Sequence, residues 1–386
     1  MLEAIDQAGQ IVSIAHLQAG QLDDLKRHAQ FICPDCKQAV MIRYGPYVTP
    51  HFAHYADSNC SHAGESSYHE KAKVNLANWL KAQGLPAQVE HYIAETKQMA
   101  DVFTTVNKKA IALEFQHSIV PASQIISRTK KYLQAGIYPL WIVSMKLMPK
   151  RGQLTQFLRH FIHQFHDSYP PSLYFYCPDQ NRLTIWQHIY LIHHQCFRTV
   201  THHHLRKLHL PDLFASQPFP AQALWQMWAQ AKRKFRLHRP LRLSKRAFHF
   251  RNALYEKGYY IDYLPSLIHL PVSQQMLIQA PIYEWQTNYI VYYFNDLPNG
   301  AILDLNEGPS LRSLPLIQTS LHPLEQYLTY LQAFQYVELN RAGDYVKKQS
   351  IPFYESLESA INGDLSLFRD KKKVQLLHKL FKNSVY

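Results

Sequence analysis

The chain has 386 residues, a formal charge of +13 at pH 7 and a hydrophobic content of 47%. This hydrophobic content excludes a disordered protein, and the length allows two or three domains, each with its own core. No apolar run is long enough to cross a bilayer, and the first residues do not resemble a secretory signal. We therefore expect a cytoplasmic protein without membrane insertion. The excess positive charge favours a polyanionic partner, either nucleic acid or an anionic membrane surface.

Residues 1–62 alternate short strand-like stretches with turns, which predicts a small β module. The chain has five cysteines, an odd number that argues against a disulfide framework, and three of them lie in this module. Structural zinc takes four sulfur or nitrogen ligands, and a CxxC pair followed by HxxH and a third cysteine can supply them. The predicted Zn²⁺ ligands are Cys33, Cys36, His54 and Cys60, with His51 as the strongest substitute. The alternative is that the cysteines are reduced core residues and the histidines are surface groups.

Residues 63–149 show the pattern of an α/β domain. Apolar residues at helical spacing predict a helix from Glu65 to about Gln83. Three strands are predicted next, at Gln88–Ala94, Met99–Val106 and Lys109–Phe115, with Asn107-Lys108 as a hairpin turn between the last two. A helix at Ser123–Gln134 and a buried strand at Ile137–Val143 follow. This order of elements predicts an α/β sandwich.

Two carboxylates in this domain lie on strands that are otherwise apolar. An acid on a half-buried strand is costly unless it is paired or binds a cation. Asp101 and Glu114 on adjacent strands could share one Mg²⁺ or Mn²⁺, which prefers oxygen ligands, activates a bound water and stabilises charge on a phosphate. Glu65 and His69 project from one face of the preceding helix, and Gln116 shares a strand face with Glu114. Taken singly, these residues also have ordinary explanations, such as an acid that complements a helix dipole.

Several motifs occur in an order that resembles the competence protein CoiA family. They are Phe31-Ile32-Cys33-Pro34-Asp35-Cys36, His51-Phe52-Ala53-His54, Glu65-Ser66 with His69 and Lys73, Ala100-Asp101-Val102, Glu114-Phe115-Gln116 with Ser118, and Arg128-Thr129 with Tyr132. The resemblance extends to about Met145 and is much weaker over the C-terminal part.

The resemblance implies a central domain of the PD-(D/E)XK nuclease type. In that arrangement Asp101 and Glu114 are the metal-binding acids, Glu65 is an accessory acid and Gln116 stands at the usual lysine position. Glutamine can orient water but brings no charge, which puts activity in question. His69 would supply a proton or contact a phosphate; the alternative is that it packs beside the helix. The residues expected to contact the DNA backbone are Ser118, Arg128 and Tyr132.

The resemblance also implies a role in natural transformation, in which incoming single-stranded DNA is processed and recombined in the cytoplasm. RecA-type recombination proteins are the partners that this role suggests. In fold, the residue patterns predict a zinc-ribbon-like β module at 1–62, and the resemblance implies a nuclease-like α/β domain at 63–149. Residues 150–386 are then a basic, mainly helical C-terminal domain.

The C-terminal domain has no acidic residue between Asp212 and Glu256, whereas cations and aromatic residues alternate there. This composition suits single-stranded nucleic acid, and we expect DNA contacts from Lys232, Arg233, Lys234 and Arg236. The alternative is a solvated charged face, with Trp225 and Trp228 in the core. The elements expected in this domain are a helix through about Phe165, a hairpin at Leu173–Ile189, helix over Ala221–Lys257, a strand at Tyr289–Phe294 and helices from Leu324 onward.

These observations support competing hypotheses. The first is a metal-dependent DNA nuclease that acts in transformation. The second is a catalytically silent module that holds single-stranded or branched DNA or recruits recombination proteins. An RNA-binding or restriction-type protein remains a third possibility, because no motif reads base edges.

Overall fold

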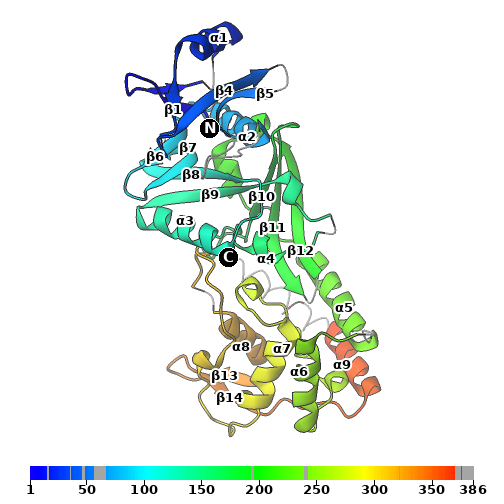
Figure 1. The fold of residues 1–386 in the computed structure, drawn as a ribbon. Helices are drawn as coiled ribbons and strands as arrows, with labels where there is room; N and C mark the ends of the chain where they lie inside the picture. Colours follow the sequence, from blue (N-terminus) through cyan, green and yellow to red (C-terminus); the bar gives the residue numbers. More distant parts are fainter. Residues whose placement is uncertain are drawn as a thin grey trace. The chain divides into compact units, whose positions relative to one another are not determined.

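The computed structural model describes residues 1–14, 17–34, 36–45, 48–55, 67–150, 152–192, 195–238, 242–320, 322–369 and 375. The chain divides into two compact units, and it passes between them several times (Figure 1). The first unit comprises Met1–Met148, Leu173–Ile185 and Val200–Ala215. The second comprises Pro149–Ser172, Trp186–Thr199 and Ser216–Tyr386.

The N-terminal part of the first unit is a five-stranded sheet in the order β2-β1-β3-β4-β5. Its strands are β1 (Glu3–Ile5), β2 (Ile11–Ser13), β3 (Phe31–Ile32), β4 (Ala39–Gly45) and β5 (Val48–His54). Helix α1 (Ala19–His28) follows β2 and was not expected, because Leu22 is its only buried residue and the segment has no continuous apolar stripe. The rings of Phe31 and Phe52 pack 4.8 Å apart in the small core of this module.

The larger sheet has seven strands in the order β12-β11-β10-β9-β8-β7-β6. The strands are β6 (Gln88–Ile93), β7 (Gln98–Val106), β8 (Lys109–Gln116), β9 (Ile137–Ser144), β10 (Leu173–Cys177), β11 (Arg182–Ile192) and β12 (Gln195–His204). Strands β6, β7 and β8 pair antiparallel, whereas β8, β9 and β10 pair parallel. Asn107 and Lys108, between β7 and β8, both have positive φ, which confirms the expected tight hairpin turn.

Helices cover both faces of this sheet. On one face, α2 (Ser67–Lys81) buries Leu76 and Leu80 in one cluster with Leu113 of β8. On the other, α3 (Ala122–Gln134), which Figure 1 shows across the sheet from α2, buries Tyr132 in one cluster with Ala112. Successive residues of β8 therefore point to different helices, as its alternating side chains require. The expected α/β sandwich is confirmed.

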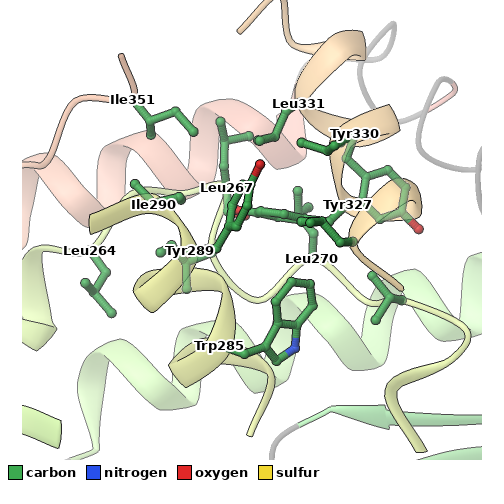
Figure 2. Packing of buried hydrophobic residues seen from close by; sticks show 14 of the residues in the cluster. Leu264, Leu267, Leu270, Trp285, Tyr289, Ile290, Tyr327, Tyr330, Leu331 and Ile351 are labelled. Atoms are coloured by element: carbon green, nitrogen blue, oxygen red, sulfur yellow. The ribbon is translucent and has the colours of Figure 1, made fainter. Parts of the chain in front are cut away.

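The second unit is mainly helical. Its helices are α4 (Gln156–Arg159), α5 (Ala221–Leu237), α6 (Lys245–Glu256), α7 (Ile282–Tyr289), α8 (Pro323–Ala333) and α9 (Leu357–Arg369), with a small hairpin of β13 (Val337–Leu339) and β14 (Tyr345–Lys347). Figure 2 shows its core, where Trp285 and Tyr289 of α7 approach Tyr327 of α8 with ring centroids 5.3 and 6.3 Å apart. No helix among the described residues is long and apolar enough to span a bilayer.

Two elements expected in this unit were wrong. Tyr289–Phe294 is not a strand: Tyr289 ends α7, and Ile290–Phe294 continues it as a π-helical turn. A short apolar run does not distinguish a buried strand from a buried helix, and here it is helix. The helix expected to run through Phe165 is only the short α4, which ends at Arg159. The hairpin from Leu173 and the helices within Ala221–Lys257 are confirmed.

A buried ion cluster joins α5 to α9. Arg236 donates from Nε to the carboxylate of Asp364 over 2.9 Å, and Lys232 Nζ lies 3.3 Å from the same carboxylate. All three side chains are less than a tenth exposed. Burial raises the pKa of Asp364, but Lys232 and Arg236 outweigh it, so the net pKa is lowered. Asp364 is therefore ionised in the interior and is the shared counterion of the two cations there.

Replacing Asp364 by asparagine should lower the free energy of unfolding by about 3 kcal/mol, because two buried cations lose their counterion. The difference should be full at neutral pH and shrink as the pH falls below 3.8, the ordinary pKa of the group. Urea unfolding followed by circular dichroism at several pH values measures it. The control is Glu338→Gln, which breaks an exposed ion pair with Lys348 and should change stability by less than about 1 kcal/mol. Equal effects of the two substitutions would contradict the assignment.

Candidate active site

A cavity of about 930 Å³ in the first unit contains both acids singled out from the sequence. Val102 of β7 pairs with Leu113 of β8, so the next residues, Asp101 and Glu114, occupy neighbouring positions on adjacent strands. Both side chains line the same cavity. The two carboxylates therefore share one site, although they sit in different surroundings.

Asp101 is held by a helix side chain and by the neighbouring strand. Its Oδ2 accepts a hydrogen bond from the backbone N–H of Phe115 over 2.7 Å and lies 3.2 Å from His69 Nε2 of α2. Burial raises the pKa of Asp101, but the positive groups of His69, Lys73 and Arg128 outweigh it and hold the pKa well below its ordinary value. Asp101 is thus a carboxylate at neutral pH, and its side chain keeps 16% of its surface exposed.

Glu114 is more deeply buried and is clamped by α3. Arg128 donates to its Oε1 and Oε2 over 2.9 and 2.7 Å, and the Tyr132 hydroxyl donates to Oε1. The Glu114 side chain is 2% exposed, whereas that of Arg128 is 39% exposed. Burial raises the pKa of Glu114 to about 7, with Asp101 adding to the rise and Arg128 opposing it. Glu114 can therefore change its protonation state near neutral pH.

The remaining predicted residues of this region lie beside the two acids. His69 is 7% exposed and stacks on His117 with ring centroids 4.6 Å apart. Gln116 lines the cavity, and its amide donates to the Ser118 carbonyl over 2.6 Å. Ser118 is exposed at the edge of the cavity. Glu65, the expected accessory acid, lies outside the described residues.

One group of cavity residues was missed by the sequence analysis. Lys73 of α2 lies 2.8 Å from Glu90 Oε1 and 3.2 Å from Glu70 Oε1, and all three side chains are almost completely buried. Glu90 has a φ of +53° within β6, a rare conformation for a residue other than glycine, and strained residues gather at functional sites. The signal was the spacing of Glu70 and Lys73, three residues apart on α2, but its partner Glu90 lies too far along the chain to be found from spacing.

A second constellation lies in the N-terminal module. Ligand atoms of Cys33, Cys36 and His54 lie within 4.8 Å of one another, with Cys36 Sγ 3.3 Å from His54 Nε2. His51, the substitute ligand, is three residues before His54 on β5, so its side chain leaves the strand on the opposite face. Cys60 lies outside the described residues. The described thiols and imidazole are of the types that tetrahedral zinc takes, and they can supply three of four ligands.

The cations expected to contact DNA from α5 lie on two sides of the helix. Arg233 and Lys234 are exposed. Lys232 and Arg236 are buried against Asp364, with exposed fractions of 0% and 3%. The sequence shows only a run of positive charge there. It does not show this division, because Asp364, the acid that pairs with Lys232 and Arg236, is more than a hundred residues further along the chain. Trp225 and Trp228 are core residues, as the alternative interpretation expected.

Comparison with known proteins places these sites in a family. Three family models match successive parts of the chain: the N-terminal domain of competence protein CoiA at residues 14–63, its nuclease-like domain at 65–218 and its C-terminal domain at 224–361. The chain belongs to the CoiA family. A curated relative, "Competence protein CoiA" from Bacillus subtilis (strain 168), is 26% identical over 372 residues, which cover 92% of this chain and 99% of the relative. No solved structure matched the fold.

The CoiA nuclease-like model spans the candidate acids, both covering helices and most of the residues that line the cavity. It begins at residue 65 and ends at 218, so it also includes β10, β11 and β12 of the large sheet. The CoiA C-terminal model begins at 224, within α5. The resemblance that the sequence motifs carried is therefore confirmed, and it extends beyond Met145.

Purified protein should contain bound zinc, and Cys33→Ser should lose it, because the thiolates of Cys33 and Cys36 would hold the same ion. Elemental analysis by mass spectrometry checks this. Cys196→Ser, a cysteine of the second unit, is the matched control and should retain the metal. Retention of a full equivalent of zinc by Cys33→Ser would contradict the site.

Glu114 should titrate near pH 7 rather than near 4.5, since burial favours its neutral form. Carbon-13 NMR of the protein labelled at glutamate carboxyl groups measures this, with Glu114→Gln identifying the signal. Tyr132→Phe should move the midpoint upward, because the lost hydrogen bond favours the charged form. A midpoint near 4.5 in the unmodified protein would show that Arg128 outweighs burial.

Proposed function

We propose that this chain acts in competence as a divalent-metal nuclease-type protein that processes incoming DNA at Asp101 and Glu114. The observation that carries the proposal is the convergence of these two acids, from adjacent strands, in one large cavity of a domain that matches a nuclease-like family model. The relative's printed name, competence protein, agrees with this role.

The side chains present fit a hard divalent cation. Asp101 is ionised and partly exposed, Glu114 lines the same cavity, and Phe115, which follows Glu114 and donates its N–H to Asp101, lines it too. Carboxylate and carbonyl oxygens are the ligands that Mg²⁺ and Mn²⁺ prefer. A bound ion would lower the pKa of a water molecule and stabilise charge on a scissile phosphate.

The surrounding residues have separate roles in this proposal. His69 holds Asp101 in place and is within hydrogen-bond distance of it. Arg128 and Tyr132 hold Glu114, so Tyr132 acts by positioning and Arg128 keeps an exposed portion that can contact DNA. Gln116 orients water without supplying charge. Glu65 is kept as an accessory acid only because the resemblance implies it.

The proposed DNA-binding residues follow the exposure of each side chain. Ser118 and Arg128 line the cavity, while the side chains of Arg233 and Lys234 are exposed on α5 of the second unit. Lys232 and Arg236 are left out because both side chains are buried and paired with Asp364. The partner is single-stranded or branched DNA in the cytoplasm, with RecA-type recombination proteins acting on the same substrate. Zinc at Cys33, Cys36 and His54, completed by Cys60, has a structural role.

A second candidate function is a catalytically silent module that holds DNA or recruits recombination proteins. Two observations favour it. The carboxylate oxygens of Glu114 already accept from Arg128, and a cation would have to compete with this ion pair. The amide of Gln116 is bonded to the Ser118 carbonyl and carries no charge to replace the usual lysine.

Purified protein incubated with Mn²⁺ should cleave labelled single-stranded or branched DNA, and Asp101→Asn should lower the rate at least about 100-fold. The control is Asp179→Asn, an exposed acid paired with Lys71 in the same unit, which should cleave normally. Cleavage that persists in Asp101→Asn would refute the assigned site. Binding of DNA by the unmodified protein without any cleavage would select the silent module.

A further inference from the structure

The cavity has a wall that does not belong to the nuclease-like domain. Ile5 and Ile11 of the N-terminal sheet, and Pro34 and Lys37 around the CxxC turn, line it together with the acids. Glu90 of the nuclease-like domain holds the N-terminal strand in place: its Oε2 accepts hydrogen bonds from the backbone N–H groups of Leu2 and Glu3 over 2.5 and 3.0 Å. The N-terminal module is thus part of the candidate site rather than a remote appendage.

The three acids that line the cavity are each paired with a positive or imidazole side chain. Arg128 is bonded to Glu114, Lys73 to Glu90, and His69 to Asp101. Two further lining cations, Lys37 and Lys97, are exposed, and neither has an ion-pair partner in the part of the chain that the structure describes. Apart from the exposed portion of Arg128, the positive charge available to a ligand in the cavity is therefore that of these two lysines.

Two apolar side chains are exposed among the same lining residues. Tyr92, on the edge strand β6, is 55% exposed, and Ile11 is 65% exposed. We call Ile11, Lys37, Tyr92 and Lys97 the rim. An exposed aromatic ring and exposed cations in one cavity are the combination with which proteins bind unpaired nucleotides, since the ring stacks on a base while the cations contact phosphates.

The exposed ring and the size of the cavity favour single-stranded over double-stranded nucleic acid. A ring can stack on the face of a base only where that face is not covered by a neighbouring base pair. A cavity of about 930 Å³ has the volume of a ligand-sized pocket, which admits an unpaired strand but does not enclose a double helix.

We propose that the rim binds single-stranded nucleic acid, with a base stacked on Tyr92 and the backbone phosphates on Lys37 and Lys97, and so leads the strand to the two acids. The inference rests on the proposed function for the destination of the strand, but the binding site itself does not require cleavage. Lys37 directly follows Cys36, so the metal-binding turn would place one of the two phosphate contacts.

The test measures binding of fluorescein-labelled oligothymidylate to the full chain by anisotropy, without added Mg²⁺ or Mn²⁺. Tyr92→Ala should raise the Kd about tenfold, the range that loss of one stacked base gives, whereas Tyr92→Phe keeps the ring and should bind like the unmodified protein. Affinity for a blunt duplex should change less than about twofold in both variants.

Lys37→Gln and Lys97→Gln should each reduce the slope of log K against log salt concentration by about 0.7, the value for one phosphate contact on a single strand. Lys109→Gln removes an exposed lysine that does not line the cavity and should leave the slope unchanged. All four positions are exposed, so these variants should unfold at the same temperature as the unmodified protein.

The outcomes separate the two proposals. Unchanged binding by Tyr92→Ala and by both lysine variants, in a protein that cleaves DNA, would overturn the rim and leave the proposed function standing. Weakened binding by these variants, in a protein that never cleaves, would support the rim and refute the nuclease activity. Equal weakening by Tyr92→Phe and Tyr92→Ala would overturn stacking, because only the hydroxyl differs between tyrosine and phenylalanine.

Discussion

Carboxylates that are withdrawn from water require a positive partner, and this requirement shapes the candidate site. Each of the three acids that line the cavity is paired with a side chain from a helix that covers the sheet. Glu114 receives Arg128 from α3, whereas Asp101 and Glu90 receive His69 and Lys73 from α2. These ion pairs tie both helices to neighbouring strands of the large sheet, and the side chains of all three pairs line the cavity.

The same requirement explains how far the sequence could predict the site. Asp101 and Glu114 were found because an acid in an apolar strand is conspicuous, and the hairpin between them fixes which strand positions are neighbours. The pair of Lys73 and Glu90 was missed because the two residues come from a helix and an edge strand whose contact depends on tertiary packing. Local periodicity predicts elements, but it does not give the partner of a buried charge.

The same reasoning accounts for the errors in the second unit. The positive run on α5 was interpreted as one surface, yet Asp364, which pairs with two of its members, lies in the last described helix. Tyr289–Phe294 was assigned to a strand because its apolar residues are consecutive. In the folded chain Tyr289, Ile290 and Phe294 are buried in the core, whereas Tyr292 is 43% exposed (Figure 2 shows Tyr289 and Ile290). Because the exposed position of this run is itself a tyrosine, no polar residue marks an outer face and the helical period is hidden.

The interleaving of the two units along the chain has a consequence for synthesis on the ribosome. The cluster that packs α2 against the sheet includes Leu205, Leu210 and Leu213, which belong to the last segment of the first unit. A nascent chain that has emerged only as far as Met148 already contains both site acids but lacks these leucines. Its nuclease-like domain therefore exposes apolar surface during translation until about Ala215 has left the exit tunnel, so this part of the chain is the one that would engage a holdase chaperone.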